Sequence, residues 1–221
     1  MARAHDLVIF DNDGVLVDSE PIAADVLARL LSEHGLPTTP QEAMRDFIGA
    51  SMERVRRVSE ERLGDRLPDD FVRRYYDALF ARYPGELRAV EGVALALARI
   101  DLPKCVASSG SLERIRRSLR LVGLWAHFEG RAFSADEVER GKPAPDLFLR
   151  AAEVMGVDPS RCAVIEDSPL GIEAANAAGM TSFAFARRTP AERLTQATGA
   201  IFSDMVELPR ILRAARGGRG G

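Results

Sequence analysis

Two acidic residues, Asp11 and Asp13, follow an apolar run of four residues, Leu7–Phe10. Four consecutive apolar residues predict a short strand that is buried on both faces. Carboxylates held this close repel one another unless a cation or a shared proton relieves them. Gly14 allows the backbone to bend so that both acids can face one point. The stretch is compatible with a metal-dependent carboxylate site and equally with a strand that ends in a polar turn.

Polar residues also follow two other predicted strands. Residues 104–108 end in Ser108-Ser109-Gly110, and residues 162–165 are followed by Glu166-Asp167-Ser168. In an open parallel sheet the ligand lies outside the carboxyl ends of the strands, so these groups are expected to converge with the first two acids. Lys142 precedes a predicted helix that should pack nearby. Each feature alone is ordinary, but their coincidence at matched strand ends indicates a site.

Phosphoryl transfer is the chemistry that suits these groups. Carboxylates such as Asp11 and Asp167 provide the oxygen ligands that Mg2+ prefers. Ser108 and the backbone amides after it can hold phosphate oxygens, and Lys142 offsets the negative charge of phosphate and carboxylates. Asp11 could then attack phosphorus, while Asp13 gives a proton to the leaving oxygen and later takes one from water.

The elements that must position these residues fall into two groups. Between residues 20 and 88 no strand is predicted, and four helices are expected at 21–34, from Thr39-Pro40 to Phe47, at 51–63 and at 69–82, the last ended by Pro84-Gly85. From Val90 onward, helices alternate with strands. Helices are expected at 92–100, 111–122, 145–155, 169–178 and 208–216, and strands at 104–108, 131–134, 162–165, 181–185 and 200–202.

This order predicts an α/β protein with a Rossmann-like parallel sheet core, helices on both faces, and a small all-α cap of four helices. Because the first strand belongs to the sheet, the helical bundle is an insertion after it. The expected division is a core of residues 1–18 and 89–216, a cap of residues 19–88, and a disordered tail of residues 217–221.

The composition excludes several kinds of partner. The 221 residues are 46% hydrophobic and 29% charged, with a formal net charge of -3 and no basic block, which argues against nucleic-acid binding. No apolar run approaches the roughly 20 residues that span a bilayer, and the first apolar run is too short for a secretory signal. We therefore expect a cytoplasmic protein without a membrane partner, and a monomer by default.

Rare residue types add further expectations. Cys105 and Cys162 each enter an apolar run, which favours buried structural thiols. The three histidines, at positions 5, 34 and 127, are expected at the surface. Lys104 and Lys142 are the only lysines in the chain.

With these motifs in order, the sequence resembles the haloacid dehalogenase superfamily, in the branch of β-phosphoglucomutase-like phosphatases with a helical cap after the first strand. The segment Asp11-Asn12-Asp13-Gly14-Val15 matches the nucleophile and acid/base motif, and Ser108 the second motif. Lys142 within Gly-Lys-Pro-Ala-Pro-Asp matches the third, and Glu166-Asp167-Ser168 with Gly171 and Ala174-Ala175 the fourth. Asn12 departs from the more apolar residue that is common there, without an expected loss of catalysis.

The resemblance implies a role for each position. Asp11 would form an aspartyl-phosphate. Mg2+ would be bound by Asp11, the backbone carbonyl of Asp13 and the side chain of Asp167, with Glu166 as a ligand or a support. The transferring phosphate would contact Ser108, Ser109 and Lys142, and Gly49 and Ser51 would belong to a specificity loop of the cap.

Single residues then separate the chemistries of the superfamily. Dehalogenases lack an acid at the position of Asp13, and phosphonatases need a cap lysine that this chain lacks. In the mutase, a cap histidine and a cap arginine are important, and Ala23 and Met52 occupy these positions here. Arg54 or Arg73 could hold a second phosphate only by another geometry.

The sequence therefore predicts a phosphoric monoester hydrolase, a Mg2+-dependent phosphatase acting on a small phosphorylated metabolite, with a sugar phosphate as the favoured substrate. A phosphosugar mutase is the alternative. A non-catalytic phospholigand sensor on the same scaffold is a weaker one, because every expected catalytic group is present.

Overall fold

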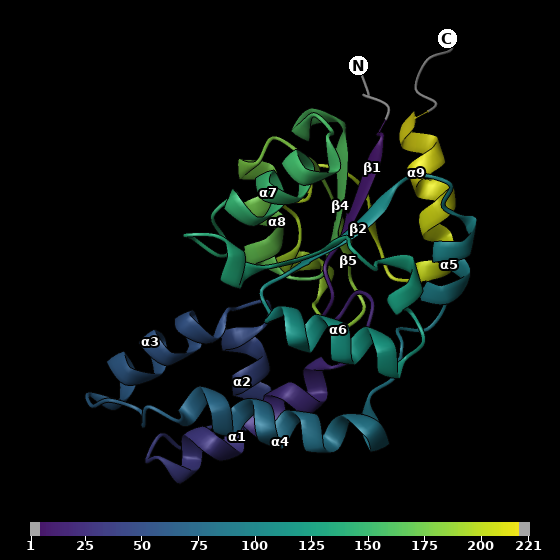
Figure 1. Cartoon of the computed structure of the whole chain (residues 1–221). Helices are drawn as coiled ribbons and strands as arrows, with labels where there is room; N and C mark the ends of the chain where they lie inside the picture. Colours follow the sequence, from purple (N-terminus) through teal and green to yellow (C-terminus); the bar gives the residue numbers. More distant parts are fainter. Residues whose placement is uncertain (1–4, 217–221) are drawn as a thin grey trace.

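The computed structural model describes residues 5–216, and its centre is a parallel sheet of six strands (Figure 1). The strand order is β3-β2-β1-β4-β5-β6. The strands are β1 Leu7–Phe10, β2 Lys104–Ser108, β3 Ala132–Ser134, β4 Cys162–Glu166, β5 Thr181–Phe185 and β6 Ile201–Phe202. The first strand of the chain therefore lies in the middle of the sheet, between β2 and β4.

Alternate side chains of the buried strand β1 serve two different cores. Leu7 and Ile9 pack in one cluster with α7 and α8, whereas Val8 and Phe10 belong to another on the opposite face. The helices are α5 Val93–Arg99, α6 Leu112–Leu121, α7 Asp146–Met155, α8 Pro169–Ala177 and α9 Leu208–Arg216. Figure 1 shows α7 and α8 on one side of the sheet and α5 and α9 on the other. The predicted α/β class, with helices on both faces, is confirmed.

Four helices inserted after β1 lie together beyond the carboxyl end of the sheet (Figure 1). They are α1 Glu20–Glu33, α2 Pro40–Phe47, α3 Met52–Leu63 and α4 Phe71–Glu86. We call them the cap. A capping box of Thr39 and Glu42 begins α2, and Gly64 ends α3 in the left-handed conformation with a φ of 71°. Residues 217–221, expected to form a disordered tail, lie outside the described residues.

The end of α4 differs from the prediction, because the helix does not stop before Pro84 but continues to Glu86. Pro84 removes its own N–H donor and crowds the carbonyl of Phe80, but the next turn is still closed, because the Leu87 amide donates to the Tyr83 carbonyl at 3.0 Å. Phe80 and Tyr83 are buried and hold this last turn against its neighbours.

Two expectations about rare residues have different outcomes. Cys105 and Cys162 are free and buried, as predicted. The prediction of a surface His5 is wrong, because its side chain is buried and its ring meets the edge of Phe183 at a centroid distance of 5.6 Å. In the described part of the chain, no helix combines the length and apolar character needed to cross a membrane.

Two antiparallel chain segments connect the core and the cap. The Val90 amide donates to the Leu16 carbonyl at 3.0 Å, and the Asp18 amide donates to the Arg88 carbonyl at 2.9 Å. The carboxylate of Asp18 accepts hydrogen bonds of 2.6 and 2.7 Å from Arg188, and it forms an ion pair with Arg187 at 2.9 Å. These arginines follow β5, so the first connection is fixed to the core.

Loss of this charge should destabilise the protein in a pH-dependent manner. Burial alone would raise the pKa of Asp18, but the hydrogen bonds from Arg188 and Arg187 outweigh it and lower the pKa. The Asp18→Asn variant should lose about 1 kcal/mol of unfolding free energy at pH 7, because the partners are partly exposed. When folding lowers the pKa of a carboxyl group, the ionised group stabilises the fold at pH values above its pKa in the unfolded chain, which is about 3.9 for aspartate. The difference should therefore shrink as the pH falls below about 4.

Urea unfolding of both proteins across this pH range measures the effect. The same change at the exposed Asp101 is the control and should have little effect. A difference for Asp18→Asn that stays constant with pH would contradict the proposed ion pairing.

Candidate active site

The carboxyl ends of three neighbouring strands bring the predicted residues together. In the register of the sheet, Phe10 of β1 pairs with Val106 of β2 and with Ile165 of β4. The residues that follow each strand therefore lie at one edge of the sheet. They are Asp11 and Asp13 after β1, Ser108 at the end of β2, and Glu166 and Asp167 at the end of β4.

Lys142, in the loop before α7, is buried among these acids. Its ammonium group donates to Asp11 Oδ1 at 2.6 Å and to Glu166 Oε1 at 2.5 Å, and its side chain is only 1% exposed. Burial alone would lower the pKa of Lys142, but the charges of Asp11 and Glu166 outweigh it and raise the pKa. The lysine therefore remains charged at neutral pH.

Three buried carboxylates gather here, and Lys142 contacts two of them, Asp11 and Glu166. Oxygen atoms of Asp11, Glu166 and Asp167 lie within 4.8 Å of one another. Burial raises the pKa of Asp11 to about 8, against the lowering effect of Lys142. Burial, together with the charges of Glu20 and the neighbouring acids, raises the pKa of Asp167 well above its usual range. The site thus holds more carboxyl groups than Lys142 alone can balance when they are ionised.

A metal ion fits this excess. Asp167 Oδ2 is buried and accepts no hydrogen bond from an N–H or hydroxyl donor of the described residues, and the side chain it interacts with is another acid, Glu20. An oxygen buried without such a donor is unfavourable, and a hard divalent cation is the partner that relieves a cluster of carboxylates. This cluster can therefore hold a divalent metal.

Glu166 differs from Asp167 because both of its oxygens already have partners. Oε1 accepts from Lys142, and Oε2 accepts from the Asp167 amide at 3.0 Å, the Ser168 amide at 3.1 Å and the Ser168 hydroxyl at 2.9 Å. A Cβ atom at Gly171 would lie 1.9 Å from this carboxylate. Glycine in the first turn of α8 is what gives Glu166 its space.

Gly14 provides a second close approach. Its φ is 81°, and a Cβ atom there would lie 2.0 Å from Asp167 Oδ2. The Gly14 amide donates to the Val17 carbonyl at 2.8 Å, which closes the turn after the paired acids. Glycine therefore permits both the turn and the close packing of the Gly14 backbone against the Asp167 carboxylate.

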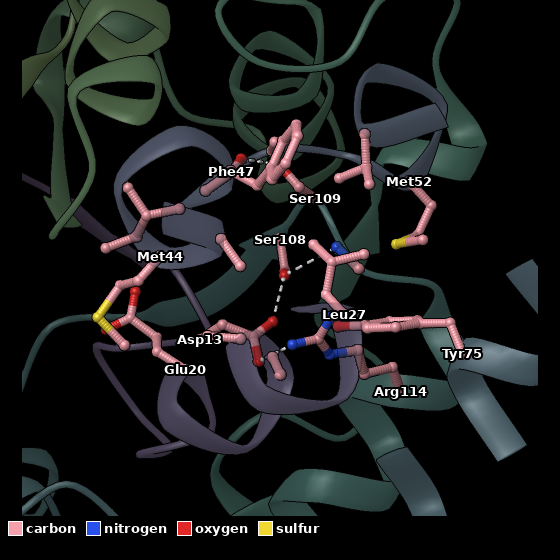
Figure 2. Close-up of a pocket in the computed structure, with 18 of the residues that line it drawn as sticks. Asp13, Glu20, Leu27, Met44, Phe47, Met52, Tyr75, Ser108, Ser109 and Arg114 are labelled. Carbon is pink, nitrogen blue, oxygen red and sulfur yellow. Dashed lines mark hydrogen bonds and ion pairs between the residues drawn. The ribbon is translucent and has the colours of Figure 1, made fainter. Parts of the chain in front are cut away.

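Asp13 has partners on both of its oxygens (Figure 2). Oδ1 accepts from Arg114 at 2.7 Å and from the Ser19 hydroxyl, and Oδ2 lies 3.5 Å from the Ser108 hydroxyl. Asn12, between the two acids, points away and exchanges hydrogen bonds of 3.3 and 3.4 Å with Ser118 of α6. A polar residue is accommodated between the two acids because Ser118 of α6 satisfies its hydrogen bonds.

Sequence reasoning missed two charged residues in this site. Arg114 is buried on α6, and no signal in the sequence separates it from the other arginines of that helix. Glu20 is the first residue of α1 and is also buried, and burial raises its pKa to about 7. Acids are common in the first turn of a helix, where they interact favourably with the helix dipole. Glu20 therefore did not stand out in the sequence as a neighbour of Asp167.

A narrow pocket opens above these groups, between core and cap. Asp11, Asp13, Ser108 and Arg114 form its floor. The cap lines it with apolar side chains, with Glu20 and Tyr75 as the exceptions, and Figure 2 shows Leu27, Met44, Phe47 and Met52 around the opening.

The predicted cap residues divide between this pocket and its edge. Gly49 lines the pocket, and its carbonyl accepts a hydrogen bond of 3.0 Å from Ser109 of the core. Ser51 instead begins α3, where its hydroxyl accepts from the Arg54 amide at 3.3 Å, and it lines a neighbouring pocket. Ala23 and Met52 both line the main pocket. Arg73 is exposed and pairs with Asp70 and Asp77.

Comparisons with known proteins agree with this architecture. A sequence profile of the haloacid dehalogenase-like hydrolase family matches residues 5–179. The 6-phosphogluconate phosphatase of Escherichia coli (strain K12) is 29% identical over 208 residues, which cover 94% of each protein. A haloacid dehalogenase-like protein of unknown function from Agrobacterium tumefaciens superposes with a TM-score of 0.81 at 36% identity, over 96% of this chain and 99% of that one. A candidate beta-phosphoglucomutase from Thermotoga maritima gives a TM-score of 0.71 at 26% identity, over 95% and 99%.

The chain belongs to the haloacid dehalogenase-like hydrolase family. The structural neighbours include β-phosphoglucomutase-like members, as the sequence motifs indicate. The family match and the phosphatase relative confirm the prediction of a phosphoric monoester hydrolase of this superfamily.

The two lysines provide a matched test of the buried ion cluster. The Lys142→Met variant leaves Asp11 and Glu166 buried without their cation, so the free energy of unfolding should fall by about 3 kcal/mol. Lys104→Met, which removes the other lysine from a partly exposed position at the start of β2, should cost less than about 1 kcal/mol. Urea unfolding at neutral pH measures both. Equal losses for the two variants would contradict the structural role of Lys142.

Proposed function

We propose that this protein is a Mg2+-dependent phosphatase that hydrolyses a small phosphorylated metabolite through an aspartyl-phosphate on Asp11. The observation that supports it most is the pairing of Asp11 with the charged Lys142 at the floor of a pocket that Asp13 also lines. A nucleophile and an acid/base group thus line the same pocket, and a buried cation is paired with the nucleophile.

Each core residue has a separate role in the proposed reaction. Asp11 attacks phosphorus, and Lys142 offsets the charge of the incoming phosphate, which the carboxylates would otherwise repel. Ser108 holds a phosphate oxygen; its hydroxyl also accepts from the Gly110 amide at 3.1 Å, which fixes its orientation. Ser109 holds the edge of the site against Gly49 of the cap. Asp13 protonates the leaving oxygen and then accepts a proton from the attacking water.

The side chains of Asp11 and Asp167 and the backbone carbonyl of Asp13 would hold the Mg2+ ion. When bound, the ion supplies positive charge that offsets the phosphate and keeps Asp11 ionised, which its pKa of about 8 would otherwise oppose. Because both oxygens of Glu166 are occupied, we assign this residue to the support of Lys142 and the loop after β4.

Phosphatase chemistry is favoured over the mutase alternative by the lining of the pocket. Ala23 and Met52 offer no charge to a second phosphate, and Arg73 is paired at the surface. Arg114 lines the pocket but is already bonded to Asp13. With a hexose 1-phosphate, a phosphatase releases inorganic phosphate, whereas a mutase accumulates the 6-phosphate without net release.

The proposed substrate class is a phosphorylated sugar or sugar acid. Its support is the likeness to a protein named for 6-phosphogluconate. A cytoplasmic location, a monomeric state, the residue limits of core and cap, and a specificity role for Gly49 and Ser51 remain predictions.

Replacement of the nucleophile is the experiment that tests the proposal. Asp11→Asn should lower phosphate release from sugar phosphates by more than about 10³-fold, because asparagine cannot accept the phosphoryl group. The measurement is inorganic phosphate released with and without Mg2+. Asp101→Asn is the control and should keep wild-type activity. A folded Asp11→Asn protein with substantial turnover would overturn the assignment.

A further inference from the structure

Arg114 is the buried cation in the pocket that the proposed reaction does not use. Its side chain is only 10% exposed, and Nη2 donates to Asp13 Oδ1 at 2.7 Å. Burial alone would lower the pKa of Arg114, but the charge of Asp13 outweighs it and raises the pKa. The guanidinium is therefore committed to the acid/base carboxylate.

The other side of this guanidinium faces the cap. In Figure 2 it lies between the Asp13 carboxylate and Tyr75 of α4. Burial raises the pKa values of the Tyr75 and Tyr83 hydroxyls, and the nearby charge of Arg114 opposes this rise at both. Tyr75 and Tyr83 stand eight residues apart on one face of α4, so a single cap helix lines the arginine.

The remaining contacts of Asp13 do not replace this one. Ser19 is a neutral donor at the same oxygen, and the Ser108 hydroxyl lies 3.5 Å from the other oxygen. Only Arg114 offers Asp13 a charged donor among the contacts described. A hydrogen bond between charged groups is about twice as strong as a neutral one, so Arg114 is the main constraint on the orientation of the carboxylate.

We propose that Arg114 is a positioning residue that holds the Asp13 carboxylate for proton transfer and links its orientation to α4 of the cap. This inference rests on the proposed function.

The role has a specific kinetic consequence. In the first step Asp13 is protonated on Oδ2, the oxygen that Arg114 does not contact. An Asp11 oxygen bonds to phosphorus, the bond to the leaving oxygen breaks, and this proton moves to the leaving oxygen while Oδ1 still accepts from Arg114. In the second step water gives its proton to Asp13 as its oxygen bonds to phosphorus, and Asp11 is released. A poor leaving group needs the proton in the first step, whereas p-nitrophenolate leaves without it.

The test compares Arg114→Met with a control on the same helix, Arg117→Met. The Arg117 guanidinium lies 4.6 Å from the ring centroid of Phe80, so it also contacts α4, and no contact with Asp13 is described for it. For Arg114→Met, kcat/KM should fall about 10²-fold with glucose 6-phosphate and less than about tenfold with p-nitrophenyl phosphate. The second step should also slow, giving a burst of nitrophenolate before steady state. Arg117→Met should leave the ratio of the two substrates unchanged.

Arg114→Lys extends the test if the methionine variant does not fold. Lysine keeps the positive charge but lacks the planar set of N–H donors of arginine. The ratio of kcat/KM for glucose 6-phosphate to that for p-nitrophenyl phosphate should therefore fall, by a smaller factor than in Arg114→Met. Equal losses with both substrates, or a higher KM at unchanged kcat, would overturn the positioning role. A wild-type protein that releases no phosphate from either ester would instead overturn the proposed function.

Discussion

The concentration of negative charge at the end of β1 is the constraint on which the rest of the site depends. Asp11, Glu166 and Asp167 are buried within 4.8 Å of one another, and Lys142 is the cation that contacts two of them. Such a cluster is costly unless each oxygen has a partner. The register of β1 with β4 creates the crowding, and the missing Cβ atoms of Gly14 and Gly171 make it sterically possible. The same buried cluster of carboxylates and Lys142 thus affects both the stability of the fold and the chemistry of the site.

The cap complements this charged floor with a nearly apolar wall. Except for Glu20 and Tyr75, the cap side chains that line the pocket carry no polar group. A wall of this kind limits water around the reacting phosphate and strengthens the electrostatic interactions below it. The contacts across the boundary include Ser109 with Gly49, Arg114 beside Tyr75 and Arg117 over the ring of Phe80. They connect the position of the cap to the groups that carry out the chemistry.

The sequence predicted the parallel sheet and the converging strand ends because apolar runs followed by acids, serines or glycine are local patterns. It could not predict Arg114 and Glu20, because their roles depend on which side chains meet across the core and cap. Arg114 stands among several arginines of α6, and only tertiary packing separates it from Arg117. The errors at Pro84 and His5 have the same cause, since packing of Tyr83 and Phe183 overrode the local rules.

The most direct test of the central claim is the mass of the protein quenched in acid during turnover of p-nitrophenyl phosphate with Mg2+. The account predicts that the protein gains the mass of one phosphoryl group, located by peptide mapping on Asp11, and that Asp11→Asn gains none. The signal should be largest in Arg114→Met, where the second step is slow. A phosphoryl group on another residue, or turnover that leaves Asp11 unmodified at every quench time, would contradict the account.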